Sequence, residues 1–269
     1  MTQFTIIAHA VLIGLTPLIP IPVLDDLVKS YFVRSLIKSL ASSYGATLTE
    51  KEMAVLTEER GTGCLNGCFF WLFEFVVKRL IRKVLFVLEW RRAIDLVTHT
   101  FYYGYLLNYA FEQGWYVAGD PNNAAKLRTA VEQARAGANT NLVKRVVQTT
   151  FNQSRQLVLG TVQQISDSIR DIAFRRSRVW ARRTLAARLR QRIPWLGRFF
   201  YRLFKPNDWE LEQVRRTESE VDERLTRESP RFQAGLGGVI AQLQAGITEL
   251  PSDHFEEMQT RLGQSLKVV

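Results

Sequence analysis

The chain has 269 residues, enough for one large domain or two small ones with ample surface to bury a core. Hydrophobic residues make up 46% and charged residues 23%, a balance that excludes a disordered chain and an ordinary multi-span transporter. Two cysteines exclude a disulfide scaffold, and a net charge of +10 points to an anionic partner such as lipid head groups or nucleic acid.

An apolar stretch without Asp, Glu, Lys or Arg occupies residues 4–24. It is long enough to span a bilayer, but Pro17, Pro20 and Pro22 disrupt its second half. It lacks a basic start and a small-residue cleavage site, which argues against a secretory signal peptide. The pattern favours a half-inserted helix that ends near Thr16, with a buried core helix as the alternative.

Two helices with recognisable ends are predicted next. The first begins at Asp25, which suits the positive end of a helix dipole, and ends before Gly45, which can supply a left-handed cap. The second is short and runs to Arg60, because Thr49 and Glu52 form a capping box at its start.

The stretch FFWLFEFVVKRLIRKVLFVLEW at 69–90 combines a wide apolar face with a narrow polar stripe. Such a helix with basic flanks is typical of the membrane interface. A spanning helix would bury four basic residues at about 2.5–3.5 kcal/mol each, so a simple span is disfavoured. A helix in a soluble core with its stripe exposed remains the alternative. The predicted lipid contacts are Phe69, Phe70, Trp71, Phe73, Lys78, Arg79, Arg82, Lys83 and Trp90.

Aromatic residues crowd the region 101–116, which contains Tyr102, Tyr103, Tyr105 and Trp115. Tyr and Trp favour the head-group layer because each has an apolar body and a polar tip. Core aromatics of a globular domain are an equally good interpretation.

Longer polar helices are predicted after this region. Asp120 and Pro121 form a typical helix start, and this helix is expected to end at Gly137. A second helix is expected from about Asn139 to past residue 190, with Gly160 as its candidate kink. An apolar stripe at helical spacing supports this helix and is formed by Val158, Val162, Ile165, Ile169 and Ile172.

The sequence predicts an all-α fold with three regions. These are an apolar helical membrane-associated domain at 1–118, an amphipathic Arg-rich helical region at 119–205, and an acidic helical tail at 206–269.

Positive charge is concentrated between residues 170 and 205, which hold 12 basic residues and one acid, Asp171. The rest of the chain therefore sums to about −1, and so local a charge indicates a binding site. The tail that follows holds 12 acids and 7 bases, so it could instead fold back and pair with the arginines. The predicted contacts to an anionic partner are Arg175, Arg176, Arg178, Arg182, Arg183, Arg188, Arg190, Arg192, Trp195 and Arg198.

Three short motifs lie in the N-terminal part: residues 20–22 (PIP) followed by Asp25, the run ASSYGATL at 41–48, and THTFYYGY at 98–105. Together they resemble an uncharacterised bacterial helical family, the YcjF-like domain that often follows Era-like GTPase domains, with similarity to EcsC-type proteins. The resemblance covers roughly residues 5–118. It implies association with the cytoplasmic membrane. The charged stripe stands where that family has a glycine-rich apolar helix pair, which favours interfacial binding over full insertion.

No catalytic, metal or cofactor site is predicted. His9 and His99 lie in apolar settings typical of core or interface histidines, and His254 has the neighbours of an ordinary surface residue. Cys64 and Cys68 would share a helix face, but no nearby His or second Cys pair completes a zinc site.

The sequence thus predicts a non-enzymatic helical protein, peripheral or partly inserted at the cytoplasmic face of the cell membrane. It would bind anionic phospholipid and serve as an assembly or scaffold component, with a protein partner or self-association. The alternative is nucleic-acid or acidic-partner binding through 170–205, because Arg-rich segments with aromatics bind phosphates and stack bases.

Overall fold

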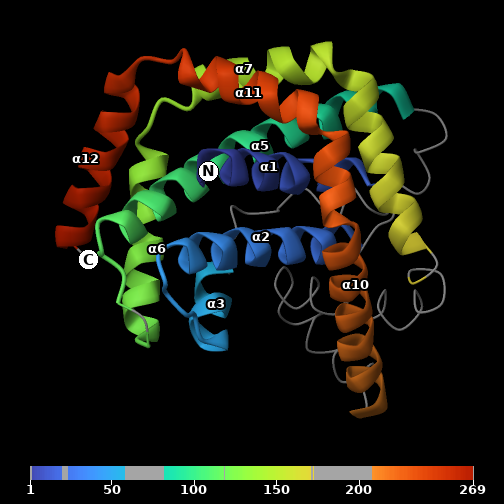
Figure 1. Ribbon diagram of the computed structural model, residues 1–269, viewed down its shortest axis with the longest axis horizontal. Helices are drawn as coiled ribbons and strands as arrows, with labels where there is room; N and C mark the ends of the chain where they lie inside the picture. Colours follow the sequence, from blue (N-terminus) through green and yellow to red (C-terminus); the bar gives the residue numbers. More distant parts are fainter. Residues whose placement is uncertain are drawn as a thin grey trace, which may run out of the picture.

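The computed structural model describes residues 2–19, 24–57, 82–117, 119–170, 172 and 208–268, and all regular structure in these ranges is helical (Figure 1). The predicted all-α class is confirmed. The elements are α1 (Thr2–Gly14), the 3-10 turn η1 (Thr16–Leu18), α2 (Leu24–Ser43), α3 (Glu50–Thr57), α5 (Arg82–Glu112), α6 (Pro121–Ala136), α7 (Asn141–Gln153), α10 (Asp208–Gly235), α11 (Gly237–Thr248) and α12 (Ser252–Val268). A further helical stretch at 155–170 follows α7.

The apolar helix α1 lies inside the bundle, between α5 and α2, with α10 and α11 also packed against it (Figure 1). Every side chain from Ile6 to Ile13 is buried. The expected end near Thr16 agrees with Gly14 as the last residue of α1. The half-inserted interpretation of 4–24 is corrected by this burial: where α1 is described, its apolar side chains face protein, as the core-helix alternative requires.

No helix in the described residues combines the length and the hydropathy needed to cross a bilayer.

The predicted caps are confirmed at atomic detail. Gly45 has φ 71°, a left-handed conformation that follows the end of α2. The Thr49 amide donates to Glu52 Oε2 at 2.8 Å, and the Glu52 amide donates back to Thr49 Oγ1 at 3.3 Å, which is a reciprocal capping box. The Asp120 carboxylate accepts from the Asn122 amide at 2.9 Å at the start of α6.

The long second helix breaks at Ser154, not at Gly160 where the kink was predicted. Ser154 has φ −102° and ψ 22°, outside helical geometry, and its hydroxyl donates to Gln242 of α11 at 3.1 Å. The chain stays helical through Gly160, and the predicted stripe from Val158 to Ile172 is buried as expected. A tertiary hydrogen bond therefore accompanies the bend, and glycine alone does not cause one.

The crowded aromatics of α5 belong to the core. Phe101, Tyr102 and Tyr103 are buried, and the Tyr103 hydroxyl donates to the Leu56 carbonyl at 2.8 Å. His254 of α12 lies 2.7 Å from the Tyr102 hydroxyl and is only 8% exposed, so its predicted surface position is wrong. Burial lowers the pKa of His254, which favours the neutral ring that can accept this hydrogen bond.

The other two histidines differ from each other. His9 is buried, as predicted, with its ring nitrogens bonded to the Thr5 carbonyl at 2.8 Å and to the Ser35 hydroxyl at 3.1 Å. His99 is exposed on α5, so the apolar setting predicted for it is wrong.

Buried residues from α1 through α12 form a single hydrophobic cluster. The C-terminal helices close this fold, because α12 packs on α6 and α5 and α11 packs on α7 and α1 (Figure 1). The described helices on both sides of residues 118 and 205 thus share one core, and the division into three regions stays a prediction.

Candidate functional site

Most predicted contact residues lie outside the described part of the chain. This applies to the lipid contacts from Phe69 to Arg79 and to all the anionic-partner contacts from Arg175 to Arg198. Arg82 and Lys83 fall in the first turn of α5, where the backbone is described and the side chains are not. These predictions are neither confirmed nor contradicted.

Trp90 is the predicted lipid contact whose side chain is described, and protein covers it. It is 9% exposed, and its indole N–H donates to Asn152 Oδ1 at 3.1 Å. Its ring packs on Phe86 with centroids 5.7 Å apart and on Phe151 at 5.8 Å. The structure thus corrects its role, which is to join α5 to α7.

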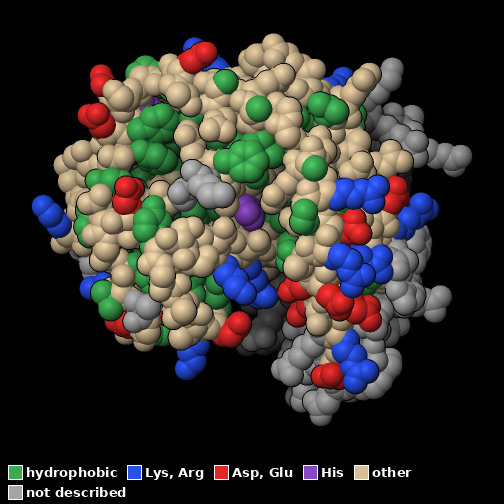
Figure 2. Space-filling view, viewed as in Figure 1, with side chains coloured by type: hydrophobic (Ala, Val, Ile, Leu, Met, Phe, Trp, Pro, Cys, Tyr) green, Lys and Arg blue, Asp and Glu red, His purple; other side chains and the backbone are tan. Residues whose placement is uncertain are grey.

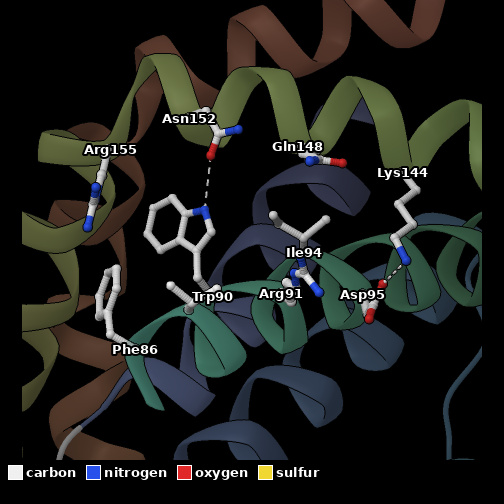
Figure 3. A pocket seen from close by; sticks show the side chains of 10 residues that line it. Phe86, Trp90, Arg91, Ile94, Asp95, Lys144, Gln148, Asn152 and Arg155 are labelled. Atoms are coloured by element: carbon white, nitrogen blue, oxygen red, sulfur yellow. Dashed lines mark hydrogen bonds and ion pairs between the residues drawn. The ribbon is translucent and has the colours of Figure 1, made fainter. Parts of the chain in front are cut away.

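An open groove of about 580 Å³ lies between α5, α7 and the start of the 155–170 helix (Figure 3). We call it the α5–α7 groove. The lining positions on α5 and α7 recur every three or four residues, which shows that one face of each helix lines the groove. Its lining residues are Phe86, Val87, Trp90, Arg91, Ile94, Asp95, Lys144, Gln148, Asn152 and Arg155.

An arginine and two aromatic rings form one end of the α5–α7 groove. The Arg155 guanidinium carbon lies 4.9 Å from the Phe86 ring centroid and 5.7 Å from the Trp90 ring. At these distances the ring quadrupoles attract the cation. Because Asn152 fixes the indole, the rings hold Arg155 at the mouth of the groove (Figure 3).

The other end of the groove is closed by an ion pair between helices. Lys144 Nζ of α7 lies 2.6 Å from Asp95 Oδ1 of α5, and both side chains are 43% exposed. At that exposure the pair contributes about 0–1 kcal/mol to stability. Its larger effect is on charge: the lining has three cations and one carboxylate, so two positive charges remain unbalanced.

The outer face of α5 next to the groove is apolar and then basic. Val87 is 52% exposed and Leu88 is 46% exposed, although both are large hydrophobic side chains. Arg91 and Arg92, one turn later on the same face, are exposed as well. Val87 and Leu88 belong to the stretch at 69–90 that the sequence assigns to a membrane interface.

The carboxylates of α10 bear on the idea that the acidic tail pairs with the arginines. Within α10, Arg216 pairs with Glu212 at 3.1 Å and Arg227 pairs with Glu223 at 3.0 Å. Figure 2 shows red and blue side chains gathered together over this helix at the lower right. At least these carboxylates have partners inside their own helix.

One buried carboxylate, Glu52, has a structural role. Burial alone would raise its pKa, but hydrogen bonds from Thr49, Tyr116 and the Gly119 amide outweigh this and lower the pKa to about 2. In the described residues no three His, Cys, Asp or Glu side chains gather as a metal site requires.

Sequence reasoning missed the α5–α7 groove because it forms only when two helices pair. The spacing of Phe86, Trp90 and Ile94 was visible within the apolar face, but nothing in the sequence placed α7 beside it. The cations of the groove were also overshadowed by the much denser charge at 170–205.

No protein family, curated protein or solved structure matches the chain. The resemblance to the YcjF-like and EcsC-type proteins therefore stays a prediction.

Proposed function

We propose that this chain is a non-enzymatic, membrane-associated helical protein that binds anionic phospholipid, as an assembly or scaffold component on the cytoplasmic face. The segment 170–205 would contact the lipid surface. The stretch at 69–90 would add a shallow apolar contact. A helical body that uses its own apolar N-terminal helix as core suits peripheral attachment.

The observation that carries the proposal is the segregation of charge. The segment 170–205 holds 12 of the 36 basic residues of the chain and one of its 26 acids. Trp180, Trp195 and Tyr201 are interleaved with these cations, and such side chains favour the head-group layer. Each Lys or Arg near an anionic surface contributes about 1 kcal/mol, so six of them supply about 6 kcal/mol.

Two features of the folded body support the proposal. The helices that flank the basic segment are tied together, because Arg224 of α10 donates to the Ser168 carbonyl at 3.3 Å. This hydrogen bond joins the described helices on the two sides of the segment. The exposed Val87 and Leu88 of α5, followed by Arg91, have the order expected of a helix that enters a lipid interface.

The first prediction tests the basic segment by flotation of the full chain with vesicles of phosphatidylglycerol and phosphatidylcholine. Reversing four charges in R182E/R183E/R188E/R190E removes about 4 kcal/mol of attraction and adds repulsion, so we expect binding to be at least about a thousand-fold weaker. The matched control is K38E/K51E/K126E/R145E, which changes the net charge equally at exposed positions of the folded body. It should float as the parent chain does.

Equal flotation of both variants would remove the segment from the mechanism. Binding to single-stranded or duplex nucleic acid, steeply weakened by salt and without flotation, would favour the alternative function.

A further inference from the structure

We infer that the α5–α7 groove is a binding site for one anionic phospholipid molecule, with the phosphate held by Arg91 and Arg155 and the acyl chains along Phe86 and Val87. This goes beyond attachment to a charged surface, because it predicts a saturable site with a stoichiometry of one. It involves none of the residues at 170–205.

Charge complementarity selects an anionic ligand. Lys144 is paired with Asp95, but in the described part of the chain neither Arg91 nor Arg155 has a carboxylate partner. Arg155 is held over two aromatic rings, so part of the entropic cost of ordering its side chain is already met. Guanidinium groups present several N–H donors and bind phosphate in a bidentate fashion.

The floor of the groove selects an amphiphile over a free anion. Phe86, Trp90 and Ile94 form an apolar base between the arginine end and the ion pair (Figure 3). Trp90 is 9% exposed and its indole N–H is bonded to Asn152, so this ring supports the base from beneath and leaves no open polar group in it. Val87, half exposed at the rim, extends this surface out toward solvent.

The position of the groove fits a ligand drawn from a bilayer. It opens beside the exposed Leu88 and Arg92 on the first turns of α5. A lipid seated there could leave its chains along the apolar rim while its phosphate stays with the cations. A nucleotide would leave this rim unused.

The second prediction is tested with dihexanoyl phosphatidylglycerol, kept below its critical micelle concentration so that it is monomeric, and titrated calorimetrically into the full chain. We expect one site per chain. The variant R91E/R155E loses two charge-assisted hydrogen bonds and adds repulsion, so its affinity should fall at least about a hundred-fold. The matched control K126E/R145E reverses two exposed cations that do not line the groove and should bind within about three-fold of the parent.

Arg155 also packs on two rings, so the single variant R91E is measured beside the double one, and a thermal melt of each verifies folding. Arg91 is exposed, and R91E should keep the fold while losing at least about ten-fold in affinity. Unchanged affinity in folded R91E and R91E/R155E would overturn the site.

Two further ligands separate the sources of the phosphate. Dihexanoyl phosphatidylcholine should bind at least about ten-fold more weakly because its head group has no net charge, and glycerol phosphate should be weaker still because it has no chains. Equal binding of phosphatidylcholine, or equal binding of glycerol phosphate, would each refute an anionic-lipid site. Flotation of R91E/R155E with vesicles should persist through 170–205, so failure of the groove and failure of the proposed function give different results.

Discussion

A single buried carboxylate, Glu52, joins two parts of the fold. The sequence predicts it as the acid of a capping box, and it does accept from Thr49. The Tyr116 hydroxyl also donates to it at 2.5 Å and the Gly119 amide at 2.8 Å. The side chain is fully buried, so α3 is anchored to the connection between α5 and α6 by a charge that has no contact with water.

The third prediction is that E52Q lowers the free energy of unfolding by about 2–3 kcal/mol, because hydrogen bonds to a charged acceptor are lost and an amide donor then faces the Thr49 amide. The matched control E50Q alters an exposed acid in the same turn and should cost about 0.3–1 kcal/mol. Urea denaturation at pH 7 measures both variants, and equal costs would contradict this role for Glu52.

The effect of E52Q on stability should depend on pH in a defined direction. The pKa of Glu52 is lowered on folding, so the carboxylate stabilises the native state above its ordinary value of 4.5. This stabilisation is lost as the pH falls from 4.5 toward 2. The difference between the parent chain and E52Q should therefore be constant from pH 7 to 5 and shrink below pH 4.5.

Among the elements, α1 and α5 are in tight contact at two glycines, Gly14 and Gly104. A Cβ atom on Gly14 would lie 2.1 Å from Val97 Cγ2 and 3.1 Å from the Ala93 carbonyl oxygen. A Cβ on Gly104 of α5 would lie 3.0 Å from Ile6 Cγ2. Because glycine has no side chain, the backbone of each helix can contact side chains of the other at these two positions.

The fourth prediction is that G14A destabilises the fold by about 1–3 kcal/mol, because an added methyl group overpacks this contact. The double variant G14A/V97A removes the nearest clashing atom, so its cost should be smaller than the sum of the two single costs. G160A is the matched control, since nothing lies within 4 Å of its Cβ; it should stabilise an exposed helix position by about 0.5–1 kcal/mol. Thermal melts rank the four proteins, and additive costs would refute the clash.

The positions and ends of the helices were easier to predict than which helices pack against each other. Local chemistry determined the helix ends at Gly45, Thr49 and Asp120, and periodicity determined the buried stripe that begins at Val158. The break at Ser154 could not be predicted, because it accompanies a hydrogen bond to a residue 88 positions away. The α5–α7 groove was missed for the same reason: one helix face cannot reveal which helix will lie beside it.

At the scale of the whole molecule, the regions defined by composition do not coincide with the hydrophobic core. Composition and charge divide the chain into an apolar start, a basic middle and an acidic end, as the sequence predicts. Burial divides it differently, since Leu12 near one end and Leu262 near the other belong to the same hydrophobic cluster. The composition of α12 does not indicate that this helix contributes to the core, because polar residues outnumber the apolar residues of its buried face.

The fifth prediction follows from this shared core, and it concerns L262A in α12. Leu262 is fully buried, so its truncation should cost about 3 kcal/mol. If the described helices unfold as one unit, the slowest-exchanging amides of α1 should exchange about a hundred-fold faster, as should those of α12. Gln264, exposed on the same helix, provides the control, and Q264A should leave both sets of amides within a few-fold of the parent. Acceleration confined to α12 would instead indicate that the C-terminal helices open independently, and the region boundaries suggested by charge would then be real boundaries of folding.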